Sequence, residues 1–238
     1  MKHYQLETRW AKTVLKHPLI VILTSIIMVM LIAYGTRYAT VSSDYRYFFG
    51  EDNPQRTAFE SLQNVYSKDD SVLITVTPED GQVFKPETLK GLQFLTSEAW
   101  LLPFVTRVDS ITNFQYSHAE GDDLVVQDLV RQQDISAHDS GEQLSKLEAI
   151  ALAEPMLINR LINEQASVTG VNVKMTFPGN SPFEVPEAAE AARQLAQTFM
   201  EKFPGHEVHL TGMVMLNDAF NEAGIRDVMT LMPVMYLL

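Results

Sequence analysis

The sequence predicts an α+β fold in which a transmembrane helix precedes a large polar domain. Three observations support this prediction. An uncharged apolar run covers residues 19–36, close to the roughly 18 residues that a helix needs to cross a bilayer. The order strand, helix, strand is indicated at residues 71–112 and again at 166–212. A second apolar run occupies residues 228–238.

Charge is distributed unevenly along the chain. Residues 1–38 carry five basic residues and one acidic residue, a net charge of +4, and the remaining 13 basic and 29 acidic residues give the rest of the chain −16. Four of the five basic residues precede the apolar run, so the positive-inside rule places the N-terminus in the cytoplasm. We therefore expect a cytoplasmic basic tail at residues 1–18, a first transmembrane helix at 19–38 and a domain at 39–227 that is periplasmic in a Gram-negative bacterium.

Composition excludes several classes of function. An acidic domain lacks the basic surface that nucleic-acid binding requires, so no nucleic-acid partner is expected. The chain contains no cysteine, which excludes disulfides, thiol catalysis and cysteine-based metal sites. A cleaved signal peptide is the alternative reading of residues 1–40, because Ala33 and Gly35 form a small-x-small pair. The apolar run is longer than the usual apolar region of a signal peptide, which favours an uncleaved span.

The first elements of the domain follow from turn residues and apolar spacing. Residues 41–49 are expected to be extended, and 50–54 form a turn cluster. A helix is predicted over 55–66 because apolar residues recur there at helical spacing. Residues 71–77 are rich in β-branched residues and apolar on both faces, which predicts an interior strand.

Pro86 marks the start of the next helix. Proline suits the first position of a helix, and Glu87 complements the helix dipole. The helix is expected to end near Trp100 and to bury one apolar face: Leu89, Leu92, Leu95 and Ala99. A strand over 105–111 completes the first strand–helix–strand unit.

A long insertion is expected at residues 113–165. We predict a polar loop over 113–123 and a short strand over 124–130. Asp139 and Glu142 resemble a capping box, which predicts a helix ending near residue 154. A short helical piece is predicted over 156–163. So long a connection is expected to form a small elaboration of its own.

The second unit repeats the first. A strand is predicted over 166–177, a turn over 178–182, a helix opening at Pro186, and a short strand over 207–210. Two such units can form a four-stranded antiparallel sheet with both helices on one face, the split βαβ or ferredoxin-like arrangement. A final helix is predicted from about Met215, continuous into residues 228–238, the expected start of a second transmembrane helix.

Few residue patterns indicate chemistry, and we expect no catalytic, cofactor-binding or metal-binding residue. His206 and His209 are three apart in a predicted strand, so they point to opposite faces and are not expected to bind a metal.

The acidic loop with His118, Glu120, Asp122 and Asp123 is expected to be solvated, since its spacing does not fit a calcium loop. No hydrolase, nucleotide-binding or zinc motif occurs, so the chain is not expected to be an enzyme; Ser140 beside His138 is attributed to helix capping.

Two apolar groups lie near the expected membrane. The methionines are read as lipid-facing or packing residues, with substrate contact as the alternative: Met213, Met215, Met229, Met232 and Met235. The aromatic residues after the first apolar run are read as an interfacial belt, with a lateral access path for substrate as the alternative: Tyr45, Tyr47, Phe48 and Phe49. No substrate-binding residue is assigned.

The order of these features resembles the N-terminal part of a resistance-nodulation-division (RND) superfamily exporter of the MMPL type. Three stretches carry the resemblance: Asp44 with residues 48–54, Tyr66 with residues 70–76, and residues 211–233 with Gly212, Asn217, Asp227 and Pro233. The chain departs from the family pattern at Phe49-Gly50, where Leu-Pro is usual, and at Lys68-Asp69, where a glycine is usual.

The resemblance implies proton-driven export of hydrophobic or amphiphilic molecules across the bacterial inner membrane. The implied partners are the lipid bilayer, such a substrate, and the remaining transporter segments or other subunits. The protonatable carboxylates of that family lie in later membrane helices, so none is assigned here. Two alternatives stay open: the extracytoplasmic sensor domain of a two-span receptor, and a structural anchor without a transport cycle.

Overall fold

The computed structural model describes residues 14–35, 49–50, 52–65, 70–136 and 140–237. The chain divides into two compact units, residues 1–41 and 42–238. The first contains helix α2 (Pro18–Gly35), which has no buried residue. Among the described residues, α2 is the one helix whose length and composition suit a membrane span. A signal sequence near an N-terminus has the same properties.

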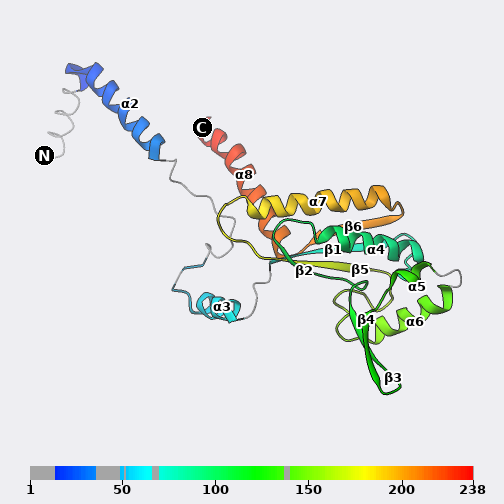
Figure 1. Ribbon diagram of the computed structural model, residues 1–238. Helices are drawn as coiled ribbons and strands as arrows, with labels where there is room; N and C mark the ends of the chain where they lie inside the picture. Colours follow the sequence, from blue (N-terminus) through cyan, green and yellow to red (C-terminus); the bar gives the residue numbers. More distant parts are fainter. Residues whose placement is uncertain (1–13, 36–48, 51, 66–69, 137–139, 238) are drawn as a thin grey trace. The chain divides into compact units, whose positions relative to one another are not determined.

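The second unit is an α+β domain with a four-stranded antiparallel sheet (Figure 1). Its strands are β1 (Asp70–Pro78), β2 (Val105–Asp109), β5 (Thr169–Met175) and β6 (His206–Thr211). Their order is β2-β5-β1-β6, and each neighbouring pair is antiparallel. The interior position predicted for residues 71–77 is therefore confirmed.

Two helices cover one face of this sheet. Helix α4 (Pro86–Ala99) connects β1 to β2, helix α7 (Glu184–Lys202) connects β5 to β6, and the two helices contact each other (Figure 1). The core between sheet and helices is fully buried: Val72, Ile74, Val76, Leu89, Leu92, Leu95 and Phe199. The predicted start of α4 at Pro86 and its predicted buried face are confirmed.

Helix α7 begins two residues before the predicted start at Pro186. The buried carboxylate of Glu184 accepts hydrogen bonds from the backbone N–H groups of Gly179, Asn180 and Ser181, at 2.8, 2.8 and 3.1 Å. Turn 178–182 is thus tied to the first turn of the helix, where a carboxylate also suits the helix dipole.

The insertion differs from the prediction in its first part. The polar loop predicted over 113–123 is wrong, because β3 (Gln115–Glu120) pairs with β4 (Asp123–Asp128) in an antiparallel hairpin. Polar residues hid the first strand, and Gly121, with φ of +66°, makes the tight turn. A short helix α5 (Gln132–Ser136), absent from the prediction, follows. Helix α6 (Ser140–Ala153) confirms the predicted helix, while its capping residue Asp139 lies outside the described residues.

The short helical piece predicted over 156–163 is also wrong. The segment forms consecutive turns, and Asn159 adopts the left-handed conformation with φ of +58°, which interrupts a right-handed helix. The Asn163 side chain then accepts hydrogen bonds from the backbone of Ser167 and Val168 at 2.8 and 3.0 Å. These turns delay the start of β5 to Thr169.

Helix α8 (Met213–Leu237) is continuous over 25 residues and contains Pro233. The predicted continuity into residues 228–238 is confirmed up to Leu237 as helical structure. Helix α3 (Pro54–Val65) confirms the helix predicted over 55–66. The extended segment predicted over 41–49 lies outside the described residues, except for Phe49.

Candidate functional site

One end of the sheet is where the domain connects to helix α8; we call it the junction end. Asp70 at the start of β1 pairs with Met175 at the end of β5, and Met175 pairs with Val105 at the start of β2. Strand β6 also ends there, since Thr211 pairs with Leu73. Helix α8 begins immediately after this point, so β1 starts and α8 leaves from the same end of the sheet (Figure 1).

Large apolar side chains are exposed at the junction end. Trp100 and Leu101, which follow α4, are 49% and 77% exposed, and Phe183, which precedes α7, is 72% exposed. In the neighbouring connections of the chain, the rings of Phe104 and Phe177 pack with centroids 5.3 Å apart. Exposed tryptophan and phenylalanine at one end of a domain are typical of a surface that contacts a membrane or another protein.

A glycine makes the connection into α8. Gly212 has φ of +112°, a conformation that favours glycine, and a Cβ at this position would overlap the backbone carbonyl of Ser71. The absence of a side chain therefore lets the start of α8 lie directly against the backbone of β1.

An ion pair holds the beginning of α8 to α7. A guanidinium nitrogen of Arg193 lies 2.5 Å from Asp218 Oδ2 and 3.6 Å from Glu222 Oε1. The Asp218 side chain is 4% exposed. The hydrogen bond to Asp218 raises the pKa of Arg193, although burial opposes this. The first two turns of α8 are thereby fixed to the domain, while residues 222–235 are exposed.

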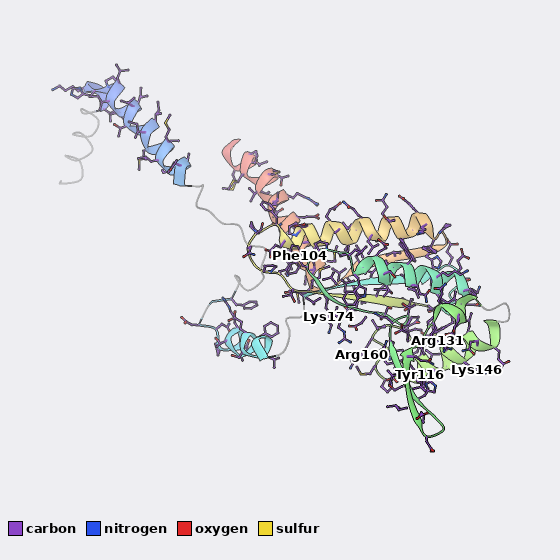
Figure 2. The ribbon with its side chains drawn as sticks, viewed as in Figure 1. Phe104, Tyr116, Arg131, Lys146, Arg160 and Lys174 are labelled. Carbon is purple, nitrogen blue, oxygen red and sulfur yellow. The ribbon has the colours of Figure 1, made fainter. Side chains whose placement is uncertain are left out.

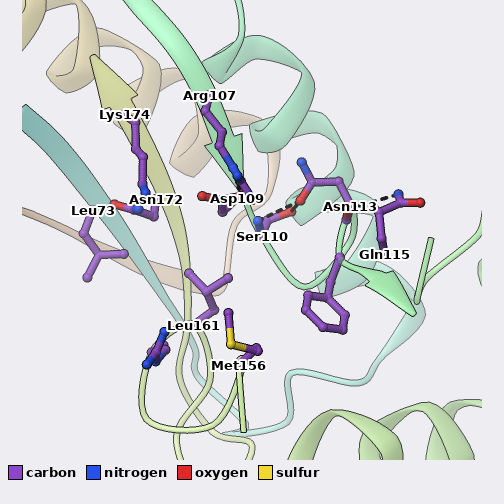
Figure 3. A pocket seen from close by; sticks show the side chains of 12 residues that line it. Leu73, Arg107, Asp109, Ser110, Asn113, Gln115, Met156, Leu161, Asn172 and Lys174 are labelled. Carbon is purple, nitrogen blue, oxygen red and sulfur yellow. Dashed lines mark hydrogen bonds and ion pairs between the residues drawn. The ribbon is translucent and has the colours of Figure 1, made fainter. Parts of the chain in front are cut away.

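A pocket of about 490 Å³ opens on the sheet face opposite the helices (Figure 3). Leu73 of β1, Asn172 and Lys174 of β5, and Arg107 of β2 alternate with core residues, so they point to this face. Met156, Arg160 and Leu161 from the turns of the insertion form the opposite wall. The pocket therefore lies between the sheet and the turns of the insertion.

The pocket is locally basic in an acidic domain. Arg107 Nε lies 2.6 Å from Asp109 Oδ1, so these two charges are paired. Figure 2 labels Arg160 and Lys174. Across the described part of the chain, their side chains make no ion pair or hydrogen bond. Three cations thus face one carboxylate. This arrangement suits an anionic group better than a cationic one.

The two histidines considered from sequence are separated by the strand. His206 and His209 lie on opposite faces of β6, as predicted. His206 Nε2 is 3.0 Å from Thr88 Oγ1 and its Nδ1 is 3.0 Å from the carbonyl of Phe203. His209 Nε2 lies 3.0 Å from Glu207 Oε1. His206 is therefore occupied in joining β6 to α4 and to the end of α7.

The acidic loop considered from sequence is the β3–β4 hairpin. His118 stacks on Tyr116 with ring centroids 5.2 Å apart, and Glu120 is paired in register with Asp123. The described residues contain no group of three or more side chains arranged to hold a metal ion.

The two apolar groups are placed only in part. Met213 and Met215 are half-buried at the start of α8, and Met229, Met232 and Met235 are exposed. Phe49 is exposed, while Tyr45, Tyr47 and Phe48 lie outside the described residues, as do His138 and the side chain of Ser140.

Sequence reasoning missed both the pocket and the Arg193–Asp218 pair. Each joins residues far apart in the chain, and no local pattern marks them. Two basic residues at outward strand positions, Arg107 of β2 and Lys174 of β5, were the one available signal for the pocket. No protein-family model and no curated protein sequence matches the chain.

Proposed function

We propose that this chain is the N-terminal part of a proton-driven RND/MMPL-type exporter of hydrophobic or amphiphilic molecules in a bacterial inner membrane. In this proposal residues 39–227 are a periplasmic porter domain, α2 is the first transmembrane helix and α8 leads into the second. The antiparallel strand order β2-β5-β1-β6, with a helix after β1 and after β5, is consistent with the proposed split βαβ arrangement. This order supports a porter-type domain.

The observation that carries the proposal is the attachment of α8. A helix fixed to the domain by Arg193 and Asp218, and continuous for 25 residues, can pass a movement between the domain and its apolar end. The exposed Trp100, Leu101 and Phe183 at the junction end favour the same orientation, with this end toward the bilayer.

The experiment interrupts α8 beyond its attachment. A flexible Gly-Ser segment inserted between Ala223 and Gly224 of the full-length protein should abolish efflux of the amphiphilic dye anilinonaphthalene sulfonate from cells and leave membrane insertion intact. A matched insertion after Asp122, in the exposed β3–β4 turn, should leave efflux unchanged. Wild-type efflux after the first insertion would contradict the proposal.

The alternative is the extracytoplasmic domain of a two-span sensor receptor. The pocket favours this receptor alternative, because a sensor domain can bind a ligand there without any transport cycle. An exporter should move dye only while a proton gradient exists, so a protonophore should stop efflux. A receptor should show no gradient-dependent efflux at all.

A further inference from the structure

The pocket on the open sheet face combines three structural contributions. The residues with outward side chains on β1, β2 and β5 form its floor, and the turns of residues 156–161 form its wall (Figure 3). Its volume of about 490 Å³ lies within the range of small-molecule sites in proteins, roughly 300–1,000 Å³. Its ligand class should follow from the side chains that line it.

The charged side chains that line the pocket favour an anionic ligand over a cationic one. Lys174 is half-buried and its ammonium has no partner among the described residues, and Arg160 projects from the wall without one. Asp109 contributes the one carboxylate, and Arg107 is paired with it at 2.6 Å. An anionic group between Arg160 and Lys174 would gain charge-assisted hydrogen bonds that a cation could not form.

The apolar part of the lining suits a hydrocarbon chain. Leu73 and Leu161 are half-buried at the pocket, and Met156 is 57% exposed there. Methionine adapts to apolar ligands of varied shape because its side chain is unbranched and flexible. An exposed methionine beside two leucines and two unpaired cations therefore matches a molecule with one anionic end and one apolar end.

We infer that this pocket binds anionic amphiphiles, with the head group between Arg160 and Lys174 and the chain against Leu73, Met156 and Leu161. The inference rests on the proposed export function for its biological setting, and it narrows the substrate class to amphiphiles with a carboxylate, sulfonate or phosphate head. The binding itself requires only the pocket.

The experiment uses the full chain in nanodiscs of zwitterionic phosphatidylcholine, which avoids detergent in the pocket. The probes are a twelve-carbon fatty acid carrying a photoreactive diazirine in its chain and the same chain with a trimethylammonium head. After illumination, labelled peptides are identified by mass spectrometry. The digestion uses a protease that cleaves at glutamate, so that cleavage does not depend on Arg160. We expect the carboxylate to label the peptide containing Met156 and Leu161 at least tenfold more than the cationic probe does.

Charge-removing variants test the residues. The double variant Arg160→Gln with Lys174→Gln should lower labelling of this peptide by the carboxylate at least fivefold. Lys146→Gln, on α6 and not among the residues that line the pocket, should leave it unchanged. Unchanged circular dichroism and thermal midpoints verify that the variants fold. Equal labelling by the two probes, or labelling that survives the double substitution, would overturn the inference.

The outcome separates this inference from the proposed function. Head-group-selective labelling in a protein that shows no gradient-dependent efflux would support the pocket and contradict the exporter. Gradient-dependent efflux without selective labelling would support the exporter and contradict the pocket.

Discussion

The guanidinium of Arg193, in the middle of α7, lies 2.5 Å from the carboxylate of Asp218, in the second turn of α8. Asp218 is nearly fully buried, whereas Arg193 is more than a third exposed. Solvent on the arginine side reduces the strength of the pair below that of a fully buried one. Arg193 nevertheless compensates the buried negative charge of Asp218 at the point where α8 leaves the domain.

Asp218→Asn should loosen this attachment. Removing the charge leaves Arg193 without its closest partner, and we expect the free energy of unfolding to fall by about 1–3 kcal/mol. Hydrogen exchange should increase in residues 213–222 before the rest of the domain. Glu190→Gln is the control, because Glu190 is exposed and 3.8 Å from Arg193. An equal effect of both substitutions would show that Asp218 has no special role.

Gly212→Ala should be strongly destabilising. The residue has a positive φ, and the added methyl group would overlap backbone atoms of Ser71 that cannot move aside easily. We expect a loss of roughly 2–5 kcal/mol in the free energy of unfolding. Gly224→Ala, inside α8 with open space around it, should instead stabilise the helix by about 0.5–1 kcal/mol. Thermal unfolding of both variants measures the contrast, and a tolerated alanine at 212 would contradict the described turn.

Acid should weaken the insertion through Asp134. Burial by itself would raise the pKa of this carboxyl, but hydrogen bonds from the side chain and backbone of Arg131 outweigh burial and lower the pKa. Because the folded pKa is below the unfolded value of about 3.9, the pair stabilises the fold above that pH. This stabilisation is lost as the pH falls through the folded pKa.

Asp134→Asn tests this dependence. The variant should be less stable at pH 7 by about 1–2 kcal/mol, with a smaller further loss than the wild-type protein between pH 5 and pH 2. Urea unfolding at several pH values provides the measurement. Asp122→Asn, in the exposed hairpin turn, should behave as the wild type. A parallel pH profile for Asp134→Asn and the wild type would contradict the assignment.

The orientation of the junction end can be measured by tryptophan fluorescence. The chain has two tryptophans, Trp10 and Trp100. In the variant Trp10→Phe, brominated lipids in nanodiscs should quench Trp100 if the junction end contacts the bilayer. The control adds Trp100→Phe and Gln82→Trp, which moves the fluorophore to the turn at the opposite end of the sheet, where we expect no quenching. Equal quenching at both positions, or none at Trp100, would reject the proposed orientation.

The sequence by itself determined the elements whose signals are local. Pro86 and the apolar spacing after it set the start and the buried face of α4, and the β-branched run at 71–77 identified an interior strand. Local signals failed in the insertion. The strand at 115–120 is polar because a protruding hairpin needs backbone pairing more than burial, and the turns at 156–163 depend on a left-handed Asn159.

Tertiary structure alone decided the features on which the proposed function and the proposed ligand site depend. Arg193 pairs with Asp218, and Leu73 comes to line one pocket with the turns of the insertion, only after the chain has folded. Neither arrangement leaves a periodic pattern, because each brings together residues that are distant in the chain. Hydrophobic periodicity indicates which side of a helix or strand is buried. Predicting a site also requires knowing which other helix, strand or turn packs against that element, and periodicity does not contain this information.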